Sequence, residues 1–164
     1  MIMKRIGVLS DTHLKGPDAF LEEIVSNHFA DVDLIVHAGD MVSLNVLDVF
    51  ARMDKEVVAV CGNMDGYDVR GSFPASHTLV IEGLSIGIIH GWGSPVGIRR
   101  RIMNSFKKVD AVIYGHTHEG FSDTEAGIFF FNPGSPTDSR FTSRRSIGII
   151  TIHKHTIGGE LIPL

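Results

Sequence analysis

Short apolar segments alternate with amphipathic segments through the first 60 residues of the chain. Residues 6–9, 34–36 and 57–60 have the length and the nearly continuous apolar character of buried strands. Between them, residues 17–30 carry apolar side chains at helical spacing, and residues 46–50 indicate a second helix. Strands that alternate with helices in this order predict parallel pairing through right-handed crossover connections.

The second half of the chain shows a different pattern, with more strands and fewer helices. Apolar residues 79–81 and 86–89 flank Glu82 and Gly83, which predicts a β-hairpin. Residues 95–109 have the spacing of a third amphipathic helix. Further strands are expected at residues 111–114, 128–131 and 147–152 and near Leu161.

Together these elements predict an α/β fold in which two packed mixed β-sheets are flanked by helices, an α-β-β-α sandwich. No internal repeat, low-complexity segment or linker interrupts the 164 residues. We therefore expect a single domain that comprises residues 1–164.

Side chains able to bind metal ions stand directly beyond the C-terminal ends of five predicted strands. These residues are Asp11, Asp40, Asn63, His90 and His116. In α/β sheets the carboxyl ends of the strands converge on the crevice where ligands bind. Core packing does not explain five such side chains at one edge, so the sequence predicts a metal site there.

The local spacing of these residues supports the same prediction. Residues 11–13 (Asp-Thr-His) and 116–118 (His-Thr-His) alternate, so that in an extended loop both outer side chains of each motif point the same way. A glycine precedes Asp40 and another precedes Asn63, which allows a sharp turn of the backbone. Mixed carboxylate and imidazole ligands suit Mn, Fe, Zn, Ni or Co better than Ca or Mg.

Composition narrows the class of protein. The chain has 19 acidic and 15 basic residues and a formal net charge of -4, which argues against binding of duplex nucleic acid. Cys61 is the only cysteine, so an intramolecular disulfide is excluded. The N-terminal apolar segment is too short for a signal peptide, and no run approaches the roughly 18 apolar residues of a membrane span. We therefore expect a soluble, cytoplasmic protein.

Five ordered blocks of the sequence resemble the calcineurin-like metallophosphoesterase family. The blocks are Asp11-x-His13, Gly39-Asp40, Gly62-Asn63-x-Asp65, His90 and Gly115-His116-x-His118. The short chain and the Asn-Pro-Gly-Ser segment at 132–135 further resemble the small bacterial and archaeal phosphodiesterases of that family, in which this segment lies near the metals and shapes the cleft.

This resemblance implies an enzyme with two divalent ions, of which Asp40 bridges the pair. The first ion would be bound by Asp11, His13, Asp40 and His118. The second would be bound by Asp40, Asn63, His90 and His116. Paired ions would hold a hydroxide that attacks a small phosphoester, with Asn63 and His116 also contacting the phosphate. We expect Mn²⁺, with Ni, Fe, Zn and Co as alternatives.

The sequence departs from the family pattern at two positions. Met64 follows Asn63 where many relatives carry a histidine that assists the leaving group, and a thioether has no proton to give. The small phosphodiesterases similarly lack that histidine, so cleavage of diesters with good leaving groups is favoured. Ser43 stands where the family often has Asp or Asn, which predicts that one outer support is missing.

Several other polar residues are candidates for lesser roles. His37 could orient Asp40, and Asp65 fits a supporting carboxylate or a simple turn residue equally well. Arg140 is a candidate contact for a substrate phosphate. The run 99–101 (Arg-Arg-Arg) is predicted to be a solvated helix face, and Cys61 a small core residue. Surface positions without a function are predicted for His28, His77, His153 and His155.

Two other functions compete with a phosphodiesterase. A non-catalytic scaffold, like the retromer subunit that resembles this family in fold, is disfavoured because all seven ligand positions are occupied by competent ligands. A phosphomonoesterase, including a protein phosphatase, is disfavoured by Met64 and by the absence of insertions that would form a peptide groove. The expected partner is a small phosphodiester, without a membrane or duplex nucleic acid. Formation of a homo-oligomer stays open.

Overall fold

The computed structural model describes residues 3–164 and contains, over that range, two five-stranded mixed β-sheets. The first sheet has the order β10-β9-β1-β2-β3, in which β1 to β3 are parallel and β9 and β10 are antiparallel. Its strands are β1 (Lys4–Leu9), β2 (Leu34–His37), β3 (Glu56–Ala59), β9 (Ser146–His153) and β10 (Thr156–Pro163).

The second sheet has the order β4-β5-β6-β8-β7, with parallel β5, β6 and β8 between antiparallel edge strands. Its strands are β4 (Ser76–Ile81), β5 (Leu84–Ile89), β6 (Ala111–Tyr114), β7 (Phe121–Glu125) and β8 (Ile128–Asn132). The predicted hairpin is formed by β4 and β5, with Glu82 and Gly83 between them. The predicted strands are confirmed, whereas β7 was not predicted.

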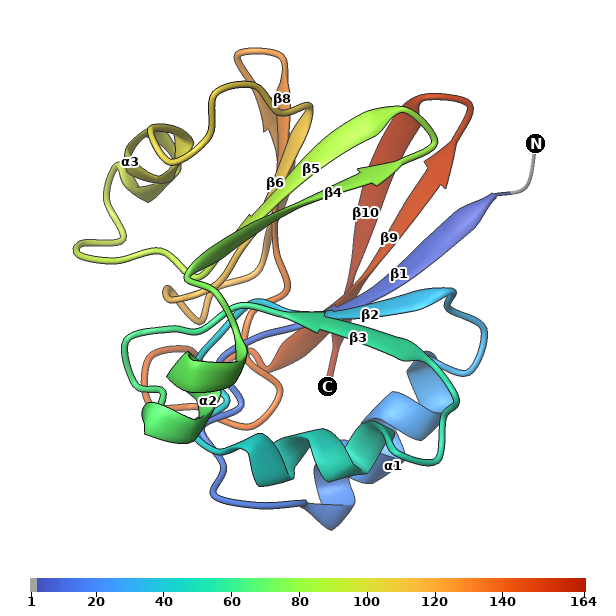
Figure 1. The fold of residues 1–164 in the computed structure, drawn as a ribbon, viewed down its shortest axis with the longest axis vertical. Helices are drawn as coiled ribbons and strands as arrows, with labels where there is room; N and C mark the ends of the chain where they lie inside the picture. Colours follow the sequence, from blue (N-terminus) through green and yellow to red (C-terminus); the bar gives the residue numbers. More distant parts are fainter. Residues whose placement is uncertain (1–2) are drawn as a thin grey trace.

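Helices cover the outer faces of the two sheets (Figure 1). Helix α1 (Ala19–His28) begins after Asp18, whose side chain accepts a hydrogen bond from the Leu21 amide, so it is shorter than the predicted segment 17–30. The second predicted helix is the 3₁₀ helix η1 (Leu44–Phe50), and α2 (Tyr67–Ser72) was not predicted. Within residues 3–164, no helix is long and apolar enough to cross a membrane.

The third predicted helix is much shorter than residues 95–109. Helix α3 (Ile98–Met103) buries only Ile98 and Ile102, and most of the polar residues after Asn104 point to solvent. Arg99 is not on a solvated face, because its guanidinium lies 2.7 Å from the Glu125 carboxylate and over the ring of Phe121. The prediction that Arg99 is solvated is therefore wrong, because its side chain contacts β7.

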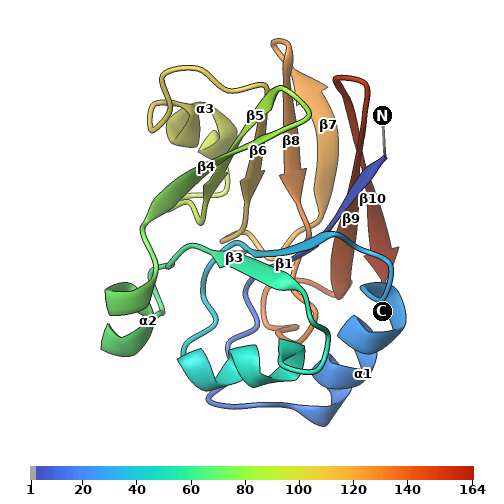
Figure 2. The ribbon, with the colours of Figure 1, turned by 45° about the vertical axis from the view of Figure 1, so that its right-hand side comes forward.

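The layers are held together by alternation along the strands. In β1, Ile6 and Val8 point toward the second sheet, whereas Leu9 packs against α1. In β8, Phe129 and Phe131 face the first sheet and Phe130 faces α3. Apolar clusters thus fill the three spaces between four layers, and the two views in Figures 1 and 2 show how these layers are arranged. The predicted α-β-β-α arrangement is confirmed.

Phe131 is the largest side chain that is fully buried between the two sheets. Its ring occupies space left open by two glycines of the facing sheet. A Cβ atom at Gly148 would lie 2.2 Å from Phe131 Cζ, and one at Gly159 would lie 2.5 Å from the same ring. The ring and these two glycines therefore fit one another closely.

We expect Phe131→Ala to lower the free energy of unfolding by about 3–5 kcal/mol, because it removes apolar contacts and leaves a cavity. Urea unfolding monitored by circular dichroism measures this change. Val80→Ala is the matched control, since Val80 is 73% exposed on β4, and it should change stability by less than about 0.5 kcal/mol. Equal effects of the two substitutions would contradict this description of the core.

Candidate metal centre

The predicted ligands lie in loops that follow β1, β2, β3, β5 and β6, as expected from the strand ends. Main-chain hydrogen bonds hold these loops together. The Asp11 amide donates to Gly39 O at 2.9 Å, the His13 amide to Asp40 O at 3.0 Å, and the Gly115 amide to His90 O at 3.0 Å. These bonds join loops within each sheet, and the bond from His90 Nδ1 to Ala38 O at 2.8 Å joins the loops of the two sheets.

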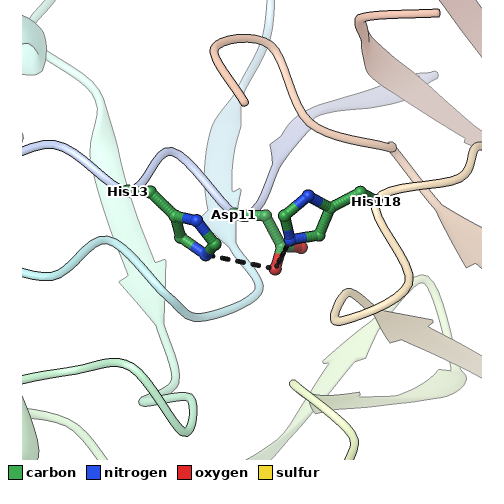
Figure 3. Close-up of side chains that lie close together, drawn as sticks. All are labelled: Asp11, His13 and His118. Atoms are coloured by element: carbon green, nitrogen blue, oxygen red, sulfur yellow. Dashed lines mark ion pairs between the residues drawn. The ribbon is translucent and has the colours of Figure 1, made fainter. Parts of the chain in front are cut away.

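Asp11 is fully buried at the centre of this edge. Its Oδ2 atom accepts hydrogen bonds from the Ser10 hydroxyl at 2.7 Å and from the His116 amide at 3.0 Å. Its Oδ1 atom lies 3.2 Å from His118 Nε2 and 3.7 Å from His13 Nε2 (Figure 3). His90 Nε2 lies 3.7 Å from the same oxygen.

Asp40 connects the two predicted ligand sets. Its Oδ2 atom lies 3.2 Å from His13 Nε2 and 3.1 Å from His90 Nε2, and its Oδ1 atom accepts the Met64 amide at 2.7 Å. The close ligand atoms form two groups, within each of which they lie no more than 4.8 Å apart. The groups are Asp11, His13 and His118, and Asp11, Asp40 and His90.

The hydrogen bonding of these side chains fits a divalent ion. Asp11 Oδ1 and His90 Nε2 are buried and make no hydrogen bond to any of residues 3–164, an arrangement that folded proteins rarely leave uncompensated. His90 Nδ1 donates to Ala38 O at 2.8 Å, which leaves Nε2 available as a ligand. Carboxylate oxygens and imidazole nitrogens match the preferences of Mn, Fe, Co, Ni and Zn.

Asn63 and His116 lie at the rim instead of in these two groups. His116 Nδ1 is 3.1 Å from Asn63 Oδ1, and His116 Nε2 is 2.8 Å from Gly93 O. The structure therefore brings five of the seven predicted ligands into direct contact and places the other two beside them on the wall of the cleft.

The backbone around the site is strained. Five predicted ligands have φ between 50° and 72°, in the left-handed region that non-glycine residues seldom adopt. They are Asp11, His13, Asp40, His116 and His118. Such strain costs roughly 1–3 kcal/mol per residue and is concentrated at functional sites. Gly62 is required for a different reason, since a Cβ there would lie 2.2 Å from Asp40 Oδ1.

Asp65 fastens two of the ligand loops together. Its Oδ2 atom accepts the amides of Gly62 at 2.6 Å and Asp40 at 3.0 Å, and its Oδ1 atom accepts the Val42 amide at 2.6 Å. Ser43, the departure from the family pattern, instead caps η1 through a hydrogen bond from the Asn45 amide. Asp65 thus supports the loop of Asp40 directly.

His37 is fully buried behind the same loops. Its Nδ1 atom accepts the Gly39 amide at 3.2 Å, so Nε2 carries the proton and donates to Thr12 Oγ1 at 3.0 Å. Burial lowers the pKa of His37 to about 4. The ring therefore stays neutral at pH 7 and contacts the neighbours of Asp11 and Asp40, not their carboxylates.

Asp138 was missed in the sequence, although it belongs to this centre. Its buried Oδ2 atom lies 2.6 Å from His13 Nδ1 and 3.9 Å from His118 Nδ1, and the Arg140 guanidinium holds both carboxylate oxygens. The bonds from Arg140 lower the pKa of Asp138. Arg140, predicted to contact phosphate, is therefore engaged with Asp138, although its side chain also lines the cleft.

The segment 132–135 shapes the site as the resemblance implied. Asn132 Nδ2 donates to Gly115 O at 2.9 Å, and Ser135 Oγ donates to Asp11 O at 2.8 Å while accepting the Asp138 amide. This turn thus connects three loops of the centre.

The surface positions predicted for four histidines are confirmed, and Cys61 packs against the apolar cluster under α1. These histidines are His28, His77, His153 and His155.

The carboxylates and imidazoles of the centre shift one another's pKa values. Burial favours a raised pKa for Asp11, but the neighbouring His118 and His90 imidazoles and the Ser10 hydroxyl together outweigh burial, and the pKa is lowered. Burial favours a lowered pKa for His90, yet the Asp40 and Asp11 carboxylates raise it to about 9. Since a metal ligand must be unprotonated, an ion held by His90 near neutral pH would displace a proton from its ring.

A cavity of about 630 Å³ opens onto the centre. Its lining residues are His13, Asp40, Asn63, Met64, Pro95, His116, Thr117, His118, Glu119, Arg140 and Phe141. Asn63 and His116, the two predicted ligands that lie at the rim, face this space together with Arg140. Asp11 and His90 lie beneath it. The cavity gives a small ester access to the centre.

We expect Asp138→Asn to weaken metal binding by roughly 10- to 100-fold, because the amide no longer holds the His13 ring as a charged acceptor. Titration calorimetry, in which Mn²⁺ is added to the metal-free protein, measures this change in affinity. Asp31→Asn, at an exposed aspartate, should bind Mn²⁺ like the wild type. Unchanged affinity in Asp138→Asn would show that His13 does not depend on this contact.

His37 gives the protein a defined acid sensitivity. Above pH 6.5 the ring is neutral in the folded and unfolded chain, and below that pH the unfolded chain gains a proton that the folded chain resists down to about pH 4. Stability should therefore fall across this window by up to about 3 kcal/mol. His37→Gln, which cannot titrate, should lose less stability than the wild type between pH 7 and pH 4.5 in urea unfolding.

The control for this experiment is His28→Gln, because His28 is exposed. That variant should keep the acid sensitivity of the wild type. Identical pH dependence in all three proteins would mean that His37 takes up its proton freely in the folded state.

Comparison with known proteins agrees with this geometry. The family model for the calcineurin-like phosphoesterase superfamily domain matches residues 3–155. The probable metallophosphoesterase MJ0623 of Methanocaldococcus jannaschii is 40% identical over 138 residues, which are 82% of this chain and 69% of that protein. Phosphodiesterase MJ0936 of the same organism is 29% identical over 161 residues, which cover 92% of this chain and 94% of the relative.

Among solved structures, Vps29 of Chaetomium thermophilum matches with a TM-score of 0.75 over 98% of this chain and 97% of its own. At 17% identity this likeness shows the fold alone. The family model, in contrast, covers nearly all of the described residues and includes every predicted ligand. The protein therefore belongs to the calcineurin-like phosphoesterase superfamily.

Proposed function

We propose that this protein is a phosphodiesterase that hydrolyses small phosphodiesters with two divalent transition-metal ions, Mn²⁺ being the preferred ion. The observation that carries the proposal is the buried Asp11 Oδ1 atom, which faces three imidazole Nε2 atoms and makes no hydrogen bond to the described residues. When bound, the ions supply Lewis-acid stabilisation of phosphate oxygens and activate water.

The chain's own residues divide the work of binding. Asp11, His13 and His118 would hold one ion, and Asp40 and His90, whose group also includes Asp11, would hold the other. Asp40 suits a bridging role, because its Oδ2 atom contacts one histidine from each set. Asn63 and His116, from the rim, would complete the second ion and contact the phosphate from the wall of the cavity.

The environment of the leaving group supports diesters over monoesters. Met64 lines the cavity and has no proton to give. His37 and Asp65 are buried and bonded to loop amides, so neither reaches the cavity as a replacement acid. A diester with an acidic leaving group needs no such acid, whereas a poor leaving group would lose a typical ~10²–10⁴-fold contribution. The relative MJ0936 is named a phosphodiesterase.

We expect chelation to abolish hydrolysis of bis-p-nitrophenyl phosphate and added Mn²⁺ to restore it. Asp40→Asn should lower kcat/KM by at least about 10²-fold, because it weakens contacts to both ions and each lost 1.36 kcal/mol is tenfold in rate. Metal content measured on the same samples should fall in parallel.

His28→Ala is the control, since its side chain is exposed and remote from the described cavity. It should retain wild-type rates. The proposal is overturned by full activity of a metal-free preparation. A panel that includes p-nitrophenyl phosphate decides between the two esterases, because faster cleavage of the monoester would favour a phosphomonoesterase. Activity on neither ester would leave the scaffold function.

A further inference from the structure

The lining of the cavity over the metal centre includes apolar side chains that the proposed reaction does not use. Met64, Pro95 and Phe141 line it together with the ligands. Met64 is 55% exposed and Phe141 is 71% exposed, so neither large apolar side chain is buried by the rest of the described chain. They come from two separate loops, one after β3 and one after β8.

Contacts place the Phe141 side chain and the Met64 backbone directly beside the centre, and both residues line the cavity. The Phe141 ring packs edge-on against His118, with ring centroids 5.1 Å apart and an interplanar angle of 85°. The Nε2 atom of that histidine lies 3.2 Å from Asp11 Oδ1. The Met64 amide donates to Asp40 Oδ1 at 2.7 Å. A substituent on a phosphate bound at the centre would therefore lie next to Phe141 and Met64.

The volume of the cavity and the charges of its lining residues indicate what kind of molecule it can bind. A volume of about 630 Å³ lies within the roughly 300–1,000 Å³ of small-molecule sites, and so leaves room for more than a phosphate group. Arg140 also lines the cavity, and its guanidinium carbon lies 5.6 Å from the Phe141 ring centroid. The carboxylate of Glu119 also lines the cavity and disfavours an anion beside it. The anionic phosphate is therefore favoured at the metal end.

Phe141 and Met64 make more favourable contacts with an aromatic ring than with an alkyl chain. Phenyl rings gain from edge-to-face or offset contact with another ring, and methionine sulfur makes favourable contacts with aromatic edges. Pairing with a flat ring would also cover the exposed faces of Phe141 and Met64 from water.

We propose that Phe141 and Met64 form a subsite for an aromatic ring of the substrate, so that the enzyme acts on aryl or nucleoside phosphodiesters in preference to alkyl or lipid-derived ones. This inference rests on the proposed function, because the ring is positioned by a phosphate at the metal centre. It adds the class of substituent that the site recognises.

Two pairs of ligands test the subsite on the Mn²⁺-loaded protein by titration calorimetry. Phenylphosphonate and methylphosphonate differ by an aryl ring, and AMP and ribose 5-phosphate differ by a nucleobase. Burying the ring should make the aromatic member of at least one pair bind roughly tenfold tighter. A preference in the first pair alone identifies aryl esters, and one in the second pair identifies nucleoside esters.

Phe141→Ala should reduce that ratio to about two or less, whereas Tyr67→Ala, at an aromatic residue 98% exposed and outside the cavity lining, should keep it. Equal affinities within both pairs for the wild type, or a preference that survives Phe141→Ala, would overturn the subsite while leaving the proposed function intact. If none of the four ligands binds, the centre does not take a phosphoryl group, and both proposals fall.

Discussion

A carboxylate removed completely from water must be compensated by its neighbours, and the surroundings of Asp11 are arranged around that need. An uncompensated buried carboxylate costs several kcal/mol, and far more if nothing relaxes. The Ser10 hydroxyl and the His116 amide satisfy one oxygen, and three imidazoles surround the other. Gly115 belongs to the same solution, because a Cβ there would lie 2.7 Å from Asp11 Oδ2. The two sheets must therefore meet with their loops in one relative position.

The supporting residues carry that constraint outward. Asp65 binds the amides of two loops, the neutral His37 ring connects one of these to the loop of Thr12, and Asp138 stands behind His13 with Arg140 holding it. These contacts oppose the backbone strain of the ligands, which the loops would otherwise relieve by turning away. The apolar clusters between the layers supply the stability against which this strain is maintained. Rigidity of the centre thus depends on a core that lies far from the chemistry.

The same fold serves proteins as different as MJ0936, named a phosphodiesterase, and Vps29, named for vacuolar protein sorting. Fold alone therefore does not decide function, which has to be argued from the side chains of the site. In this chain the site combines polar and apolar side chains. The polar end of the cavity, with its buried carboxylates and imidazoles, favours a phosphoryl group bound to metal ions. The exposed apolar side chains of Phe141 and Met64 in the same lining bear on which substituent that phosphoryl group carries.

The sequence by itself determined the strands with continuous apolar character and the ligands that follow them, because parallel strands bring distant polar residues to a common edge. It could not determine β7, whose polar, exposed residues form a strand only because β8 offers its backbone. It also gave no sign of Asp138, since the contact with His13 joins residues 125 positions apart. Nor did local spacing show that Arg99 turns to Glu125, or that helix α3 ends at Met103. Hydrophobic periodicity along the sequence indicates which face of an element is buried. Contacts between residues distant in the sequence form only when the layers pack together.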